Sequence, residues 1–180
     1  MDGLNKYIYI DNILSNDERR LLFDYVKIFN ISNKTNFCEQ CSLGETYKYG
    51  DPIADSLLVS KKDIFERASK LKLIETYSYW RLYKKFSTLK KHTDRDSCEV
   101  TVSVNVAADV EWPLFIDNER IIINPGDGVL YFGAKSEHWR EEYEGDHSLQ
   151  IFLHYVLEDG KFKNNKWDGR PCLGVLQSAL

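Results

Sequence analysis

From about residue 75 onward, the chain alternates between apolar and polar residues, and this alternation is the feature that most restricts its fold. The segment "EVTVSVNVAAD" places four valines on one face and Thr101, Ser103 and Asn105 on the other. "TYSYWRLYKKF" alternates as well, and "WPLFID", "ERIIINPGDG", "GVLYFG" and "HSLQIFLHYV" are each bounded by Gly, Pro, Asn or Asp. We therefore expect six or more short strands in this part of the chain.

The residues before this region predict one strand and two helices. "YIYIDNIL" is typical of a strand, and "SNDERRLLFDYVKIF" of an amphipathic helix with Ser15 or Asn16 as its N-cap. Residues 30–56 are polar and predict a long loop, whereas residues from about 58 to 73 predict a second helix. Helices followed by strands indicate a mainly β (α+β) fold, an antiparallel sandwich or open barrel with the helices packed outside.

Length and charge limit the classes of protein to consider. A chain of 180 residues suits one domain, which we divide into an N-terminal part (1–74), a β core (75–156) and a polar tail (157–180) that wraps the surface. The chain has no secretory leader pattern and no apolar run near the ~18 residues of a membrane helix, so we expect a soluble, cytoplasmic protein. Because the net charge is −4, we do not expect nucleic acid as a partner, and because no apolar run is long enough for a membrane helix, we expect no membrane partner either.

Two local patterns have more than one interpretation. The run "RLYKKFSTLKKH" is either a solvated strand and loop or a basic rim that attracts an anionic ligand. Cys38 and Cys41 have Cys-x-x-Cys spacing, but a structural zinc site needs four ligands and the sequence has no second close pair. We expect free thiols there, with a redox dithiol as the alternative.

His92 and Asp94 begin a candidate metal site. Residues two apart on a strand point to the same side, so the two side chains can bind one ion together. A third ligand must come from the other three histidines, and His138 is the best placed, because it ends the segment that leaves the turn "NPGDG". Two histidines and one carboxylate form the facial triad of non-haem Fe(II) oxygenases, which leaves three metal positions open.

These motifs resemble the Fe(II)/2-oxoglutarate-dependent oxygenases of the prolyl hydroxylase type, in particular a group of small bacterial and phage members. The similarity covers about residues 7–172 and rests on "HTDRDSCEVTVSVNV", "EWPLFID", "NPGDGVLYFG" and "HWREEYEGDHSLQIFLHYV". It implies a double-stranded β-helix (jelly-roll or cupin-like) in which His92, Asp94 and His138 bind iron. It also implies that 2-oxoglutarate and O2 are consumed, with release of succinate and CO2, to hydroxylate an unactivated C–H bond. Halogenases of this superfamily lack the carboxylate ligand, so Asp94 favours hydroxylation.

The residues that would hold 2-oxoglutarate are less well defined. The resemblance implies a tyrosine on the strand before the His-x-Asp motif, which is Tyr83 here, and Arg81 shares its side of that strand. The family places an Arg or Lys nine or ten residues after the second histidine, but this chain has His147 there. Either a protonated His147 substitutes for that cation, or Arg81 or Arg140 does, or the chain does not use 2-oxoglutarate.

The substrate class and the function each have an alternative. The resemblance points to a peptidyl prolyl or other protein side chain, and a small molecule is the alternative; residues 30–56 are the expected place for a substrate lid. The competing functions are a metal-binding cupin-like protein and a non-catalytic β-barrel binding module.

Two further residues near the site have expected structural roles. We expect Arg95 to orient Asp94 and His154 to be a hydrogen-bonded core residue. The localisation we expect is the cytoplasm of a bacterium or of a phage-infected host.

Overall fold

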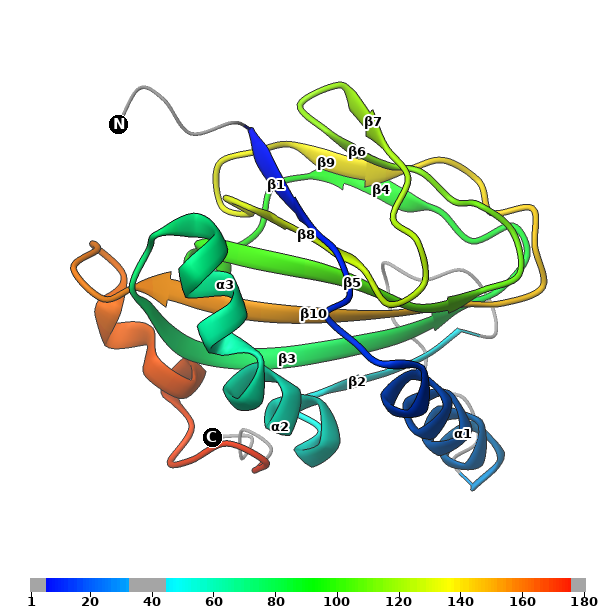
Figure 1. Ribbon diagram of the computed structural model, residues 1–180, viewed down its shortest axis with the longest axis horizontal. Helices are drawn as coiled ribbons and strands as arrows, with labels where there is room; N and C mark the ends of the chain where they lie inside the picture. The colour runs from blue at the N-terminus through cyan, green and yellow to red at the C-terminus, as the bar shows by residue number, and fades with distance from the viewer. Residues whose placement is uncertain (1–5, 33–44, 176–180) are drawn as a thin grey trace.

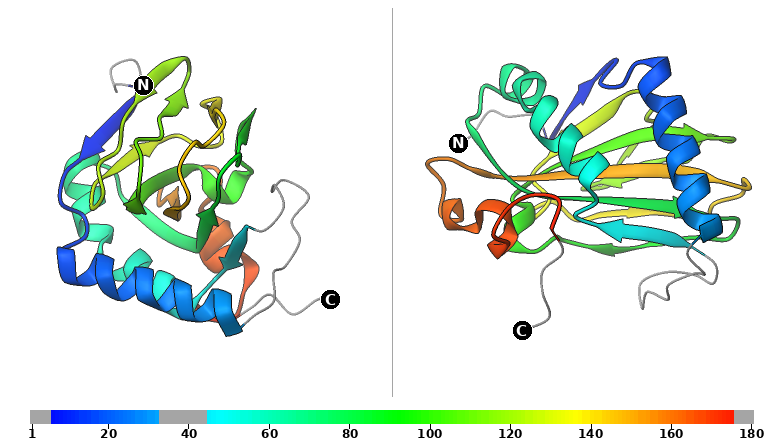
Figure 2. Two further views of the ribbon diagram at one scale, coloured as in Figure 1. Left: turned by 90° about the vertical axis from the view of Figure 1, so that its right-hand side faces the viewer. Right: turned by 90° about the horizontal axis from the view of Figure 1, so that it is seen from below.

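Two antiparallel β-sheets face each other, and three helices cover the outer face of the larger one (Figures 1 and 2). The structure is a computed structural model and describes residues 6–32 and 45–175. No helix in these two ranges is long and apolar enough to cross a membrane.

The large sheet has six strands in the order β1-β8-β5-β10-β3-β2. Their bounds are β1 Tyr7–Ile10, β2 Thr46–Tyr49, β3 Leu73–Tyr83, β5 Val100–Ala108, β8 Gly128–Tyr131 and β10 Ser148–Leu157. The small sheet has the order β4-β9-β6-β7, with β4 Leu89–His92, β6 Leu114–Ile116, β7 Glu119–Ile121 and β9 His138–Arg140. The mainly β architecture with outer helices, predicted from the alternation, is confirmed.

The helices are α1 Asn16–Ser32, α2 Pro52–Ser60 and α3 Lys62–Ser69, with short 3-10 segments η1 Asp96–Cys98 and η2 Lys163–Gly169. A capping box starts α1: the Ser15 backbone N–H donates to Glu18 Oε2 (2.8 Å) and the Glu18 N–H donates to Ser15 Oγ (3.2 Å). The predicted N-cap region of this helix is therefore confirmed.

Two expectations for the N-terminal part were wrong. The predicted loop 30–56 contains the edge strand β2 and the start of α2, where Asp51 caps the helix and Pro52 occupies its first turn. The single helix predicted at 58–73 is two helices that meet at Lys61, and the second ends at Lys70 in a left-handed conformation (φ 59°). Cys38, Cys41 and the central part of the expected lid lie outside the described residues.

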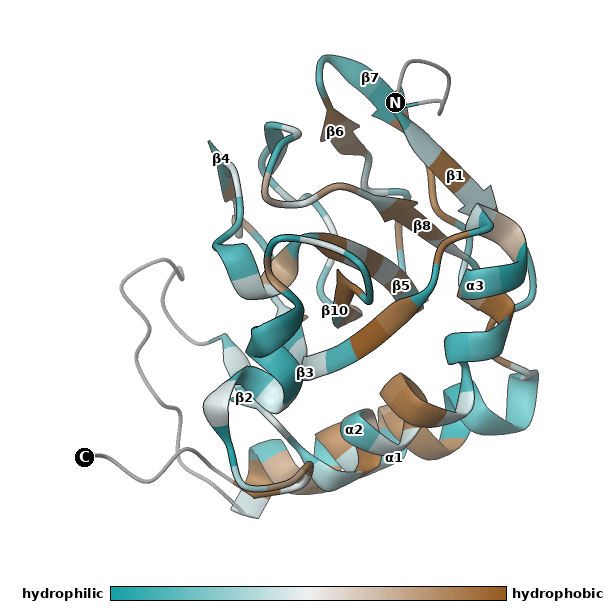
Figure 3. Cartoon of the chain, turned by 90° about the vertical axis from the view of Figure 1, so that its left-hand side faces the viewer, coloured by the Kyte–Doolittle hydropathy of each residue, from teal (hydrophilic) through white to brown (hydrophobic). Residues whose placement is uncertain are grey.

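Side chains along the long strands point alternately to the two faces of the large sheet, so that one face joins the hydrophobic core and the other faces the space between the two sheets. On β5, Val100, Val102, Val104 and Val106 point toward the helices and join the main core, which also contains Leu58 and Phe65. Figure 3 shows hydrophobic stretches on β5, β6 and β8 and on the helices beneath the large sheet. The opposite face of β5, with Thr101, turns into the space between the two sheets, and this space holds the polar residues considered next.

Candidate metal centre

His92, Asp94 and His138 come together at one end of the small sheet. His92 ends β4 and His138 begins β9, and the two residues are directly paired across these strands. Asp94 follows β4 and is fixed by a hydrogen bond from its backbone N–H to the Gly133 carbonyl (2.9 Å). Its Oδ1 lies 3.5 Å from Nε2 of each histidine, and one ligand atom from each residue lies within 4.8 Å of the others.

The hydrogen bonds around these residues prepare them to bind a cation. Nδ1 of His92 contacts the Lys90 carbonyl (2.7 Å), and Nδ1 of His138 contacts the Ser136 carbonyl (3.0 Å). Because a carbonyl only accepts, each Nδ1 carries the proton and each Nε2 presents a lone pair. Burial alone would raise the pKa of Asp94, but the imidazoles of His138 and His92, which donate to it when they are protonated, outweigh burial and hold that pKa below its usual range. The donor set is thus two imidazole nitrogens and one carboxylate, which fits a facial triad.

The three residues open into a cavity of about 330 Å³ between the sheets. Its walls are strongly aromatic: they include the five tyrosines at positions 47, 77, 79, 83 and 131, together with Phe152. Arg81, Thr101 and His154 supply most of the remaining polar atoms. Among the described residues, Arg81 lines this cavity, whereas Arg140 and His147 do not.

Arg81 lines the cavity but is already paired with a carboxylate. Its Nε and Nη2 lie 2.7 and 2.5 Å from Glu45 Oε2, and both side chains are buried. Its guanidinium also lies over the Tyr83 ring, with 4.5 Å from Cζ to the ring centroid. The charge of Arg81 is therefore largely neutralised before any ligand binds.

Arg140 is buried without a carboxylate partner among the described residues. Its Nη1 donates to the Trp112 carbonyl, its Nη2 donates to Gln150 Oε1 (3.3 Å), and its Nε is buried with no hydrogen-bond partner there. Burial lowers the pKa of Arg140 to about 10, while Tyr83 and Tyr131, two of the tyrosines in the cavity wall, act in the opposite direction. A buried cation without an anion is costly, so this position favours an anionic ligand.

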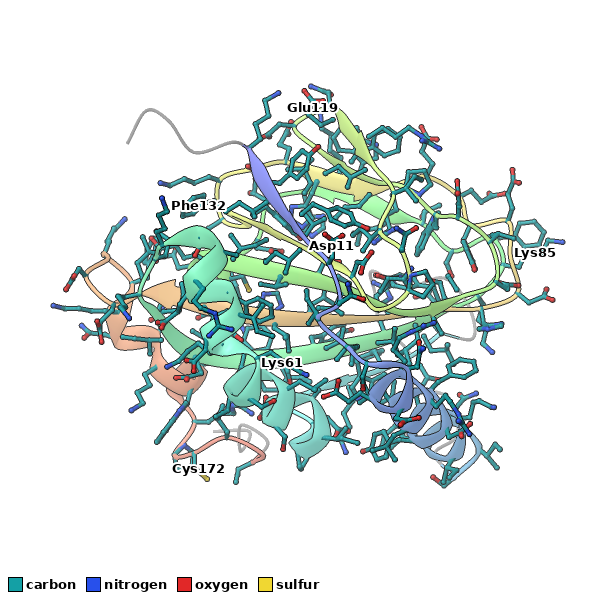
Figure 4. All side chains as sticks on the ribbon, in the orientation of Figure 1. Asp11, Lys61, Lys85, Glu119, Phe132 and Cys172 are labelled. Atoms are coloured by element: carbon teal, nitrogen blue, oxygen red, sulfur yellow. The ribbon has the colours of Figure 1, made fainter. Side chains whose placement is uncertain are left out.

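His147 and the basic segment lie elsewhere. The His147 ring stacks on Phe23 of α1, with 5.1 Å between ring centroids, and the cavity walls do not include it. Lys85 points into solvent at the outer edge of the molecule (Figure 4), and Lys91 forms a half-exposed ion pair with Glu137 (2.9 Å). Neither lysine lines the cavity, so the solvated interpretation of this segment is the better description of the two.

The sequence interpretation missed three contributors to the site. Thr101 Oγ1 donates to Asp94 Oδ2 (3.1 Å), Gly133 leaves space beside the same oxygen, and Glu45 neutralises Arg81. We expected Arg95 to orient Asp94, and this expectation was wrong. Arg95 instead donates twice to Asp168 (2.6 Å each). Only Thr101 carried a usable signal, because the alternation of β5 already placed it on the face opposite the valines.

A second group, formed by Asp94, Cys98 and His154, also brings three potential ligand atoms within 4.8 Å of one another. Burial raises the pKa of the Cys98 thiol to about 12, so the thiol stays protonated and pairs with the Tyr77 hydroxyl (3.0 Å). A metal requires the thiolate. Asp94 belongs to both groups, and the Cys98 thiol of the second group is protonated. The group formed by His92, Asp94 and His138 is therefore the better candidate centre.

No protein-family model matches the chain, and no curated protein is detectably similar to it in sequence. Solved structures match its fold. A prolyl-4-hydroxylase from Pseudomonas putida superposes with a TM-score of 0.66 at 16% identity, covering 83% of this chain and 91% of that one. The viral collagen prolyl hydroxylase of Paramecium bursaria Chlorella virus-1, in its 2-oxoglutarate complex, gives 0.64 at 14%, covering 84% and 96%.

A third match is HygX from Streptomyces hygroscopicus, a structure with nickel, 2-oxoglutarate and hygromycin B bound. Its TM-score is 0.64 at 11% identity, covering 83% of this chain and 82% of that one. These identities are low, so the likeness concerns the fold. The chain has the double-stranded β-helix fold of the prolyl hydroxylase-like Fe(II)/2-oxoglutarate oxygenases.

Proposed function

We propose that this protein is a non-haem Fe(II)- and 2-oxoglutarate-dependent dioxygenase that hydroxylates an unactivated C–H bond. The observation that carries the proposal is the placement of His92, Asp94 and His138 in the lining of a cavity in this fold, with both Nε2 atoms 3.5 Å from one carboxylate oxygen. His92, Asp94 and His138 would hold the iron, which together with 2-oxoglutarate would supply the activation of O2 for hydroxylation of a C–H bond, with succinate, CO2 and the hydroxylated substrate as products. The protein contributes the ligand geometry and orients the bond to be attacked.

The residues of the cavity also fit a dicarboxylate cosubstrate. Arg140 does not itself line the cavity, but its Nε is buried with no partner among the described residues, and two residues of the cavity wall, Tyr83 and Tyr131, lie near enough to influence its pKa. We therefore propose Arg140, rather than Arg81 or His147, as the main cation for the distal carboxylate of 2-oxoglutarate. Arg81 would act as a secondary contact, since Glu45 already balances its charge.

The class of substrate is inferred from the structural neighbours and from the size and lining of the cavity. Among the structural neighbours, one is named for collagen prolyl hydroxylation and another holds hygromycin B, so the same fold serves a protein substrate and a small molecule. An aromatic cavity of about 330 Å³ suits a single side chain or a compact ring. We propose a peptidyl side chain, such as a prolyl group, or a small molecule of similar size.

The decisive experiment is an anaerobic titration of the purified protein with Fe(II) and 2-oxoglutarate, followed by visible absorption. We expect the charge-transfer band of an iron-chelated 2-oxo acid, and its loss in Asp94→Ala. Asp96→Ala is the matched control, because Asp96 is exposed and belongs to neither potential ligand group. Iron binding without the band would favour the cupin-like alternative, and no iron binding would favour a non-catalytic binding module.

A further inference from the structure

His154 reaches the cavity from β10, and its protonation pattern follows from counting hydrogens. Thr101 Oγ1 lies 3.1 Å from Asp94 Oδ2, 3.4 Å from the Cys98 carbonyl and 3.0 Å from His154 Nδ1. A threonine hydroxyl has one hydrogen to donate, and carboxylate and carbonyl oxygens only accept. Thr101 therefore donates to an oxygen, and His154 Nδ1 must carry the hydrogen that it donates to Thr101.

This assignment leaves Nε2 of His154 as a hydrogen-bond acceptor. Burial disfavours the imidazolium form, so the ring carries a single hydrogen, which is on Nδ1. Nε2 has no hydrogen-bond partner among the residues that the structure describes, although the ring lines the cavity. An acceptor in this position is available to a molecule that enters the cavity.

The side chains around His154 present aromatic ring faces. Its ring centroid lies 4.5 Å from that of Tyr77 and 6.5 Å from that of Phe152, which is nearly parallel at 9°. The ring centroid of Tyr79 lies 6.2 Å from that of Phe152 and 5.6 Å from that of Tyr47. Three strands thus build a continuous aromatic wall with one acceptor nitrogen at its end.

The acceptor is well separated from the arginines proposed for the cosubstrate. In the pairing of β10 with β3, Gln150 lies opposite Arg81 and His154 lies opposite Tyr77. Four residues along a strand correspond to about 13 Å. A cosubstrate that extends from the metal toward Arg81 and Arg140 would therefore leave His154 free to contact another molecule.

We propose that His154 is a specificity-determining residue whose Nε2 accepts a hydrogen bond from an N–H or O–H group of the substrate. The aromatic wall would pack against an apolar face of the same group. The ligand class is thus a neutral ring or side chain that combines an apolar face with one donor. That the bound molecule is a substrate rests on the proposed oxygenase function, whereas the acceptor at His154 Nε2 and the class of ligand that it binds do not.

The first test is nitrogen-15 NMR of the histidine-labelled full chain near neutral pH. We expect His154 to have a protonated Nδ1 and an unprotonated Nε2, with its signals identified by their loss in His154→Phe. Thr101→Ser should preserve this tautomer, and Thr101→Val should abolish the preference because Nδ1 loses its acceptor. A wild-type His154 with hydrogen on Nε2 would overturn the proposal.

The second test uses phenol and anisole, which share a ring but differ in that only phenol has a donor. Titrations are run on the metal-free chain and on the chain with Zn(II) and 2-oxoglutarate, which cannot turn over. We expect wild type to bind phenol about fivefold more tightly than anisole, as for a single hydrogen bond. His154→Phe should lose this preference, and His154→Gln, which restores an acceptor, should regain part of it.

Equal binding of the two probes by wild type, no binding of either, or an unchanged preference in His154→Phe would refute the role of His154. These outcomes are separate from failure of the oxygenase proposal, which would appear as a missing charge-transfer band with Fe(II) and 2-oxoglutarate. The metal-free titration tests the acceptor even in that case.

Discussion

The Thr101 hydroxyl donates to Oδ2 of Asp94 over 3.1 Å, while the other carboxylate oxygen, Oδ1, lies 3.5 Å from Nε2 of both His92 and His138. One oxygen is thus held by the protein and the other faces the two imidazoles. This division favours coordination of a metal through a single oxygen, which keeps further metal positions open for ligands.

Thr101→Val should therefore weaken metal binding by about 10- to 100-fold, the usual effect of removing a partner that orients a metal ligand. The change keeps the shape of the side chain but removes the hydroxyl. Isothermal titration with Co(II) measures the effect, and circular dichroism checks the fold. Thr101→Ser, which retains the hydroxyl, should bind metal nearly as well as wild type; equal weakening in both variants would contradict the role of this hydrogen bond.

Gly133→Ala should damage the same site by steric means. A Cβ at this position would lie 2.4 Å from Asp94 Oδ2, 2.5 Å from Thr101 Oγ1 and 2.8 Å from the Cys98 carbonyl. We expect the carboxylate to be displaced, metal affinity to fall further than in Thr101→Val, and stability to drop by about 1–3 kcal/mol. Lys135→Ala, on the same turn but exposed, is the control for metal titration and thermal unfolding. Metal affinity equal to wild type in Gly133→Ala would show that Asp94 can adjust.

Arg140→Leu should separate stability from cosubstrate binding. Without ligand, the variant should melt at the same temperature as wild type or higher, because it removes a buried cation that has no carboxylate partner in the described structure. With a metal ion and 2-oxoglutarate, wild type should gain thermal stability and the variant should not. Differential scanning calorimetry with and without the two ligands measures both effects.

Arg81→Leu is the informative comparison for that experiment. It would leave the buried carboxylate of Glu45 unpaired and should lower stability by about 3–5 kcal/mol. If Arg140 is the main anchor, this variant should still be stabilised by 2-oxoglutarate. Loss of the ligand effect in Arg81→Leu alone would instead assign the anchor to Arg81.

Asp109→Asn should destabilise the protein in a pH-dependent way. Asp109 accepts hydrogen bonds from the Tyr143 hydroxyl and from the backbone N–H groups of Asp146 (2.7 Å) and His147 (3.2 Å). Burial raises its pKa, but these bonds outweigh burial and lower the pKa to about 2. Since the folded-state pKa lies below the usual value of 3.8, this stabilisation is complete above pH 3.8 and disappears as the pH falls toward 2.

Urea unfolding of wild type and Asp109→Asn at several pH values between 7 and 2 measures this difference. The gap between the two unfolding midpoints should be largest near neutral pH and should close in acid. A gap of the same size at pH 2 and pH 7 would mean that the carboxylate charge of Asp109 does not contribute.

The sequence predicted those features that depend on local pattern. The alternation of β5 and the N-cap of α1 are encoded within a few residues, and both appear as expected. The strand β2 was missed because four residues at a sheet edge, in a polar stretch, give little periodic signal. The start of α2 had a signal, since Asp51 and Pro52 form an N-cap and a first turn.

Contacts between distant residues could not be predicted in the same way. His92, Asp94 and His138 meet because β4 and β9 pair; spacing suggested only that His92 and Asp94 act together, and His138 was the best placed of the other three histidines. Nothing in the sequence indicated that Glu45 would neutralise Arg81 across 36 positions. The sequence therefore left both Arg81 and Arg140 as possible cosubstrate anchors, and the pairing of Arg81 with Glu45 is the reason to prefer Arg140.

The position of β10 in the large sheet has a consequence for biosynthesis. This strand pairs with β3 on one side and β5 on the other, yet it occupies residues 148–157. Until those residues leave the ribosome, β3 and β5 expose unpaired edges, which are prone to pair with other chains. The protein should therefore be most vulnerable to aggregation late in its synthesis, and chaperone dependence should be greatest for nascent chains that end before residue 148.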